Sequence, residues 1–102
     1  MEKKVTKAAE KDINSLNKSE WQEIKEKINQ ITSELSHEDL KIIDNPILDV
    51  PIWQLTVNGE STNHRVFLDI DKAKLVALAV WSYEYTHNGD EHWKKLSGRA
   101  EK

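Results

Sequence analysis

Two short runs in the second half of the chain carry the side chains best suited to chemistry. They are His64-Arg65 and Tyr83-Glu84-Tyr85, the latter followed closely by His87. An arginine, tyrosines, a carboxylate and imidazoles suit RNA cleavage through the ribose 2′-hydroxyl. That reaction needs a base for the hydroxyl proton, a cation to stabilise the phosphorane, and an acid for the departing 5′ oxygen.

Adjacent antiparallel strands would bring the two runs within side-chain reach. We therefore expect the catalytic residues to be Arg65, Glu84, Tyr85, His87 and His64, and the substrate-binding residues to be Tyr83, Lys94 and Lys95. Aromatic rings can stack on an unpaired base. A purely structural interpretation remains open, because Tyr and His at strand ends often cap a core. Arg65 would then simply pair with Asp69 or Glu84.

Other standard sites are not expected. The spacing of His87, Asp90 and His92 has a passing likeness to metal ligands, but it falls in a polar turn where such residues are ordinary. There is no glycine-rich phosphate loop and no nucleophile elbow. The chain has no cysteine, which excludes disulfides and thiol catalysis. We expect no metal and no cofactor.

Composition bounds the class of protein. The 102 residues are 37% hydrophobic and include four Trp, which fits one domain with a modest core. No apolar run approaches the length of a membrane span, and the start Met1-Glu2-Lys3-Lys4 leads into no signal sequence. We therefore expect a cytoplasmic protein with no membrane partner.

Charge gives no global attraction for nucleic acid, because the formal net charge is −3. Residues 1–50 hold eight basic and 11 acidic side chains, whereas residues 51–102 hold seven of each. Both arginines, Arg65 and Arg99, lie in the second half. An anion-binding surface is therefore expected there as a local patch.

The first half predicts two helices. An apolar stripe over about residues 4–17 consists of Val5, Ala9, Ile13 and Leu16. A second stripe over about 20–35 consists of Trp21, Ile24, Ile28, Ile31 and Leu35. Ser19 and Gln22 have the form of a capping box at its start. The short link predicts an antiparallel helical hairpin, with a two-heptad coiled coil between chains as the alternative.

The second half predicts strands. Residues 36–51, with Pro46 and Pro51, are expected to be a transitional segment. Alternation begins at Ile52, and Asn58-Gly59 indicates a turn. Strands are then expected over 64–68 and 74–85, separated by a turn at 69–72. Residues 86–102 are expected to be a polar tail or short helix anchored by Trp93 and Leu96.

These patterns predict one α+β domain over residues 1–102. Its order is α-α-β-β-β, with the helical hairpin packed on a small antiparallel sheet that forms a meander over residues 52–85.

Residues 4–87 resemble the RelE/ParE toxin superfamily of type II toxin-antitoxin systems. The first-helix run Val5-Thr6-Lys7-Ala8-Ala9-Glu10-Lys11-Asp12-Ile13, ending at Leu16, is similar to the signature of that superfamily. The runs Trp53-Gln54-Leu55-Thr56-Val57, His64-Arg65-Val66-Phe67-Leu68 and Tyr83-Glu84-Tyr85 are most similar to the YoeB-like branch. The strand that usually precedes the first helix is reduced here to about Lys3-Lys4-Val5.

The resemblance implies a toxin that cleaves mRNA in the ribosomal A site and is neutralised by a small antitoxin. It implies a metal-independent endoribonuclease, an mRNA interferase that inhibits translation. Arg65 matches the phosphate-contacting arginine, and Tyr85 matches the terminal tyrosine. Antitoxin, ribosome and mRNA are the implied partners, and a homodimer is a further candidate.

The chain departs from the family pattern at several positions. Glu84 stands where the branch has its catalytic histidine, so His87 would have to substitute. Gln54 and Thr56 replace paired lysines, only Asp44 or Asp49 lies near the position of the upstream glutamate, and the chain lacks the usual basic charge. Two alternatives therefore stay open: a ParE-like gyrase-inhibiting or non-catalytic binding member, and an unrelated small α+β adaptor.

Overall fold

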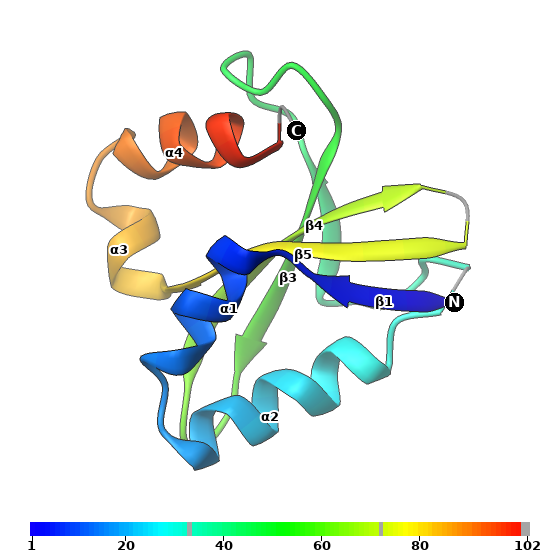
Figure 1. The fold of residues 1–102 in the computed structure, drawn as a ribbon, viewed down its shortest axis with the longest axis vertical. Helices are drawn as coiled ribbons and strands as arrows, with labels where there is room; N and C mark the ends of the chain where they lie inside the picture. Colours follow the sequence, from blue (N-terminus) through cyan, green and yellow to red (C-terminus); the bar gives the residue numbers. More distant parts are fainter. Residues whose placement is uncertain (33, 72, 101–102) are drawn as a thin grey trace.

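The computed structural model describes residues 1–100 apart from 33 and 72. Positions 33, 72 and 101–102, which belong to the expected second helix, turn and tail, lie outside the described residues. The chain order is β1 (Glu2–Val5), α1 (Lys7–Asn14), α2 (Lys18–Asn29), β2 (Leu40–Ile43), β3 (Ile52–Asn58), β4 (Asn63–Asp71), β5 (Lys74–Ser82), α3 (Tyr83–His87) and α4 (Glu91–Ala100) (Figure 1). The prediction of an α+β chain is confirmed.

Five strands form one mixed sheet in the order β1-β5-β4-β3-β2. Strands β3, β4 and β5 pair antiparallel and form the expected meander. β1 pairs parallel to β5, so the expectation of a purely antiparallel sheet is wrong. The expected remnant strand at Lys3-Lys4-Val5 lies inside β1.

Strand β2 lies inside the segment that was expected to be transitional. It pairs antiparallel with β3, which places Leu40 opposite Leu55, and both side chains are buried. Four residues are too few for alternation to stand out in the sequence, so the pairing with β3 defines this strand.

Side-chain caps start the first two helices. The Thr6 hydroxyl accepts a hydrogen bond from the Ala9 amide at the start of α1. The Asn17 side chain accepts from the Glu20 amide, and the Glu20 carboxylate accepts from the Asn17 amide. This capping box starts α2 two residues before the predicted Ser19–Gln22 box. The prediction of a Ser19–Gln22 box is therefore wrong.

Helix α2 ends at Asn29, six residues earlier than predicted. The Asn29 carbonyl accepts from the Lys3 ammonium at 3.1 Å. Ile31 is buried without being helical, and Leu35 has a positive φ of 53°. The apolar spacing continues past Asn29 because Ile31 and Leu35 still pack against the core, although the chain there is no longer α2.

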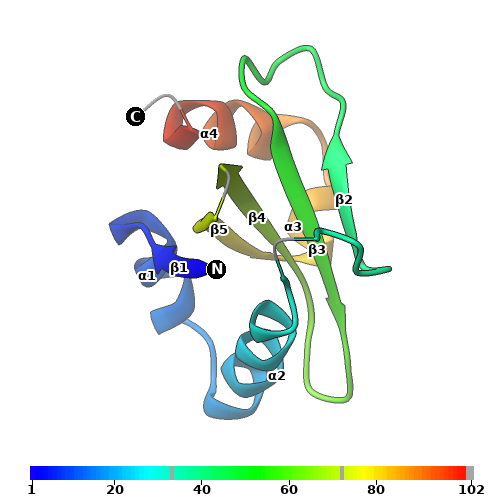
Figure 2. The same ribbon diagram turned by 90° about the vertical axis from the view of Figure 1, so that its right-hand side faces the viewer.

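Helices cover both faces of the sheet (Figure 2). On one face, α1 and α2 pack Ala9, Ile24 and Ile28 against strand residues such as Val66 and Leu68. In Figures 1 and 2 these two helices meet at a wide bend and do not lie side by side as the expected hairpin would. On the other face, α4 packs against a second core cluster that consists of Ile52, Phe67, Leu78, Ala79, Trp81 and Leu96.

The end of β5 differs from prediction in a way that affects the site. The strand stops at Ser82, and the Ser82 hydroxyl accepts from the Tyr85 amide at 3.2 Å. Serine is a strong helix N-cap, so Tyr83–His87 forms a short helix where strand was predicted. The terminal helix expected from Trp93 and Leu96 is present as α4. No described helix has the length and apolar character needed to cross a membrane.

Candidate functional site

His64 and Arg65, which were expected to act in one site, lie on opposite faces of the sheet. His64 lies opposite Val57 and Ser82, whereas Arg65 lies opposite Thr56 and Trp81. Successive side chains on a strand point to opposite faces. His64 therefore lies on the α1–α2 face of the sheet, and Arg65 lies on the α4 face, where Trp81 belongs to the core cluster.

Arg65, Tyr83 and His87 form a stacked row on the α4 face. The Arg65 guanidinium lies 4.8 Å from the centroid of the Tyr83 ring. The Tyr83 ring lies 3.9 Å, centroid to centroid, from the His87 imidazole at an interplanar angle of 34°. Tyr83 is 37% exposed, so the row is open to a ligand.

The Arg65 guanidinium is held in place by polar contacts with its own strand. Its Nη1 donates to the Asn63 side-chain oxygen at 3.0 Å and to the His64 carbonyl at 2.9 Å. Within the described residues it forms no ion pair with Asp69 or Glu84, the partners that the structural interpretation expected. An arginine carries five N–H donors, so donors remain for an anion.

The imidazole of His87 is oriented by a backbone carbonyl. Its Nδ1 lies 3.1 Å from the Tyr83 carbonyl oxygen, and the Thr86 hydroxyl donates to the same oxygen. A carbonyl oxygen only accepts, so this hydrogen bond requires the proton on Nδ1. In the neutral ring, Nε2 then carries the free lone pair, which is the form that a general base needs.

Helical geometry in α3 decides which tyrosine joins this row. Residues four apart lie on the same side of a helix, whereas residues two apart do not. Tyr83 and His87 therefore stack, and Tyr85 instead contacts Trp81 edge-on at 5.2 Å, with the Lys95 ammonium 6.0 Å from its ring. The strand expected here would have placed both tyrosines on one face. Of the remaining predicted residues, Glu84 and Lys94 are exposed.

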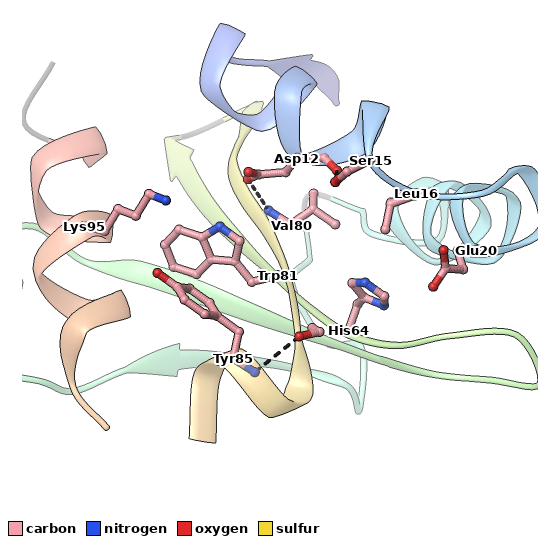
Figure 3. Close-up of a pocket in the computed structure, with 10 residues that line it drawn as sticks. Asp12, Ser15, Leu16, Glu20, His64, Val80, Trp81, Tyr85 and Lys95 are labelled. Carbon is pink, nitrogen blue, oxygen red and sulfur yellow. Dashed lines mark hydrogen bonds between the residues drawn. The ribbon is translucent and has the colours of Figure 1, made fainter. Parts of the chain in front are cut away.

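A hollow of about 440 Å³ lies apart from the stacked row, and three of the predicted site residues line it: His64, Tyr85 and Lys95. Figure 3 shows Trp81 and Tyr85 on one side of β5 and His64 on the other, with Glu20 beyond it. His64 is buried and hydrogen-bonded to the Thr62 hydroxyl. Burial lowers the pKa of His64, an effect that Glu20 opposes and Arg65 reinforces. His64 is thus a satisfied core histidine that lies apart from the stacked row.

His92 was expected to be an ordinary residue of a polar turn, and this is wrong, because it lies in α4 and is buried. It is 2% exposed, and neither ring nitrogen has a hydrogen-bond partner among the described residues. Its ring lies 4.4 Å from the Trp93 ring and 6.3 Å from the Trp81 ring, centroid to centroid. Burial lowers the pKa of His92, and the charge of His87 lowers it further, whereas Asp90 and the nearby Gly89 backbone raise it. Only the i, i+4 spacing of His92 and the predicted anchor Leu96 could have indicated a buried position.

Comparison with known proteins gives no match: no family model, no curated protein and no solved structure is similar to this chain. The resemblance to the RelE/ParE superfamily therefore stays a prediction that rests on the quoted sequence motifs alone. Among the described residues, no group of three His, Asp or Glu side chains could hold a metal ion.

Proposed function

We propose that this chain is the toxin of a type II toxin-antitoxin system and acts as a metal-independent endoribonuclease on mRNA at the ribosome. The observation that carries the proposal is the exposed row of Arg65, Tyr83 and His87, in which a cation, an aromatic ring and an imidazole are stacked together. The order of sequence motifs that resembles the YoeB-like branch supports the same function. A small antitoxin and the ribosome are the partners that this proposal implies.

In the proposed reaction, His87 Nε2 takes the proton from a ribose 2′-hydroxyl. The 2′ oxygen then attacks the adjacent phosphorus, the bond from phosphorus to the 5′ oxygen breaks, and a 2′,3′-cyclic phosphate forms. The free N–H groups of Arg65 stabilise the negative charge that develops on the phosphorane. The Tyr83 hydroxyl donates the proton that the departing 5′ oxygen needs, and the proton held by His87 then returns to Tyr83 through water.

Binding without cleavage is the second candidate. Thr56, directly opposite Arg65, and Gln54, on the same face of β3, are neutral where RelE-type enzymes carry paired lysines. The whole chain has a formal net charge of −3, and without the lysine pair this surface has fewer cations to release counterions from a nucleic acid. A ParE-like member that binds gyrase would need no such cations.

An adaptor function is the third candidate. Strand β2 lies at the edge of the sheet, and its Ile42 side chain is 53% exposed. An unpaired strand edge with an exposed apolar side chain can add a strand from another protein.

Induced expression combined with primer extension on a reporter mRNA tests the nuclease proposal. We expect wild type to arrest growth and to cut within translated codons. Arg65→Ala and His87→Asn should abolish both effects while the circular dichroism spectrum stays unchanged. Lys74→Ala is the matched control, since it removes one exposed positive charge at the start of β5 and should cut like wild type.

Three outcomes would contradict the proposal. Full toxicity of Arg65→Ala would remove the assigned role of this residue. A DNA-damage response without mRNA cuts would favour the gyrase-binding alternative. No cuts and no growth defect with wild type would favour the adaptor.

A further inference from the structure

A hollow of about 370 Å³ lies between strands β2 and β3 on one side and the end of α3 and the start of α4 on the other. Lys41 and Gln54 line it from the strands, and His87, His92 and Trp93 line it from the helical side. It is separate from the hollow of Figure 3, which has none of these five residues in its wall.

The strand register shows why these side chains meet. Lys41 lies opposite Gln54, and Gln54 lies opposite Phe67, so the three share the α4 face of the sheet. The Trp93 ring packs edge-on against Phe67, with the ring centroids 5.9 Å apart. The indole, which is only half-buried, therefore stands over the same face as the Gln54 amide and the Lys41 ammonium.

His92 gives an independent reason to expect a ligand. The ring is 2% exposed and lines the hollow. Neither nitrogen has a hydrogen-bond partner of good geometry among the described residues, although the Gly89 backbone lies close enough to raise the pKa of the ring. A buried polar atom without a partner is destabilising, so such atoms in folded proteins usually have a partner. A ligand with a polar edge that enters the hollow would supply one.

We propose that this hollow binds one nucleobase of single-stranded RNA. Trp93 provides a flat aromatic surface for stacking, and the Gln54 amide can both donate to and accept from a base edge. Lys41 can donate to a carbonyl or ring nitrogen of the base, and Asp44, which also lines the hollow, can accept from an exocyclic amino group. A free phosphate would make no use of the indole, whereas a base uses both the flat wall and the polar groups.

The position of His87 connects this hollow to the proposed nuclease. His87 stacks on Tyr83 in the catalytic row and also lines the hollow. A base bound there would belong to a nucleotide next to the scissile phosphate. This link to cleavage rests on the proposed function. If it holds, the hollow selects which base lies next to the scissile phosphate.

Equilibrium binding of short oligoribonucleotides to the full-length protein tests the inference. The probes carry 2′-O-methyl groups, so they cannot be cleaved, and binding is followed by fluorescence anisotropy. We expect Trp93→Leu to weaken binding about tenfold, because stacking of one base on an aromatic ring has that order of effect. Trp93→Phe should restore most of the affinity. Gln54→Leu, which leaves the indole in place, should weaken binding and alter base preference.

Trp53→Leu is the matched control, because Trp53 packs on the opposite face of the sheet and should not affect binding. An oligomer with abasic positions should bind as weakly to wild type as the intact oligomer binds to Trp93→Leu. The inference is overturned if wild type does not bind the probes, if it binds intact and abasic probes equally, or if Trp93→Leu and Gln54→Leu bind like wild type. Base-dependent binding without mRNA cleavage would support base binding in the hollow and contradict the proposed nuclease activity. Cleavage together with binding that does not depend on Trp93 would support the nuclease activity and contradict base binding in the hollow.

Discussion

Asp12 and Arg99 form an ion pair across the open edge of strand β5, with 2.7 Å between Oδ2 and Nη1. Strand β1 pairs with β5 only as far as Ala77. Beyond that point, Asp12 Oδ2 accepts from the Val80 amide at 3.0 Å, and Arg99 Nη1 donates to the Leu78 carbonyl at 2.8 Å. The pair thus supplies the hydrogen bonds that a longer β1 would have made, and it joins the first helix to the last.

Removal of either member of this pair should destabilise the fold. Both side chains are about 15% exposed, so Asp12→Asn or Arg99→Ala leaves a largely buried charge without its partner. We expect each to lower the free energy of unfolding by about 3 kcal/mol in urea denaturation. The double variant should lose clearly less than the sum, because it removes both charges. Strict additivity would show that the two side chains act independently.

The start of α2 gives a direct comparison between two candidate caps. Asn17→Ala removes the acceptor for the Glu20 amide and should cost about 1 kcal/mol of stability. Ser19→Ala is the control, since Ser19 lies inside the helix and is exposed. Thermal unfolding of both variants measures the difference. A larger loss for Ser19→Ala would restore the Ser19–Gln22 cap that the sequence suggested.

The turn between β3 and β4 is tied to α2 by one carboxylate. Glu23 accepts from the amides of Glu60 and Ser61, each at 2.8 Å, and a Cβ on Gly59 would clash with its Oε1. Gly59→Ala should therefore displace Glu23 and cost about as much as Glu23→Ala, roughly 1 kcal/mol. In the Glu23→Ala background, Gly59→Ala should cost little. If Gly59→Ala lowered the stability of the Glu23→Ala protein by as much as it lowers that of wild type, the cause would be the backbone conformation of the turn and not the displacement of Glu23.

Acid should destabilise the protein through its two buried histidines. Burial lowers the pKa of both His64 and His92 from the ordinary 6.5. The unfolded chain binds protons first, so stability is full above pH 6.5 and falls as pH drops below it. His92→Leu should flatten this loss in urea midpoints measured from pH 7.5 to 4.5. An unchanged acid slope in His92→Leu would reject this origin.

The two tyrosines of α3 should differ in their effect on cleavage. Tyr83→Phe removes the proposed proton donor from the stacked row and should lower the cleavage rate by about 100-fold. Tyr85→Phe should change it by about twofold at most, because Tyr85 packs against Trp81 away from Arg65. Quantitative primer extension at matched protein levels measures both rates. The opposite ranking would favour the terminal-tyrosine role that the sequence resemblance implies.

Local patterns in the sequence determined the types of most elements. The apolar spacing of Ile24 and Ile28 predicted a helix, the alternation after Ile52 predicted strands, and Asn58-Gly59 predicted their turn. These signals are local, because side-chain direction repeats every 3.6 residues in a helix and every two in a strand. The α+β class, the meander and the terminal helix with Trp93 and Leu96 could therefore be read without a structure.

Part of the candidate site was also present in the sequence but was combined wrongly. Strand alternation alone separates His64 from Arg65, and the strength of Ser82 as a helix cap could have indicated the helix that aligns Tyr83 with His87. The spacing of His92 and Leu96 gave a weak signal for the burial of His92, but nothing in the sequence indicated that it lines the same hollow as Gln54. That placement depends on how α4 packs over the sheet.

The tertiary structure alone decided where elements end and which surfaces they share. Strand β2 exists because β3 offers it a partner, and α2 stops at Asn29 although the apolar spacing continues through Ile31. The edge of β5 is completed by Asp12 and Arg99, which are 87 residues apart in the chain. Such contacts depend on the relative positions of distant segments, and no local periodicity encodes those positions.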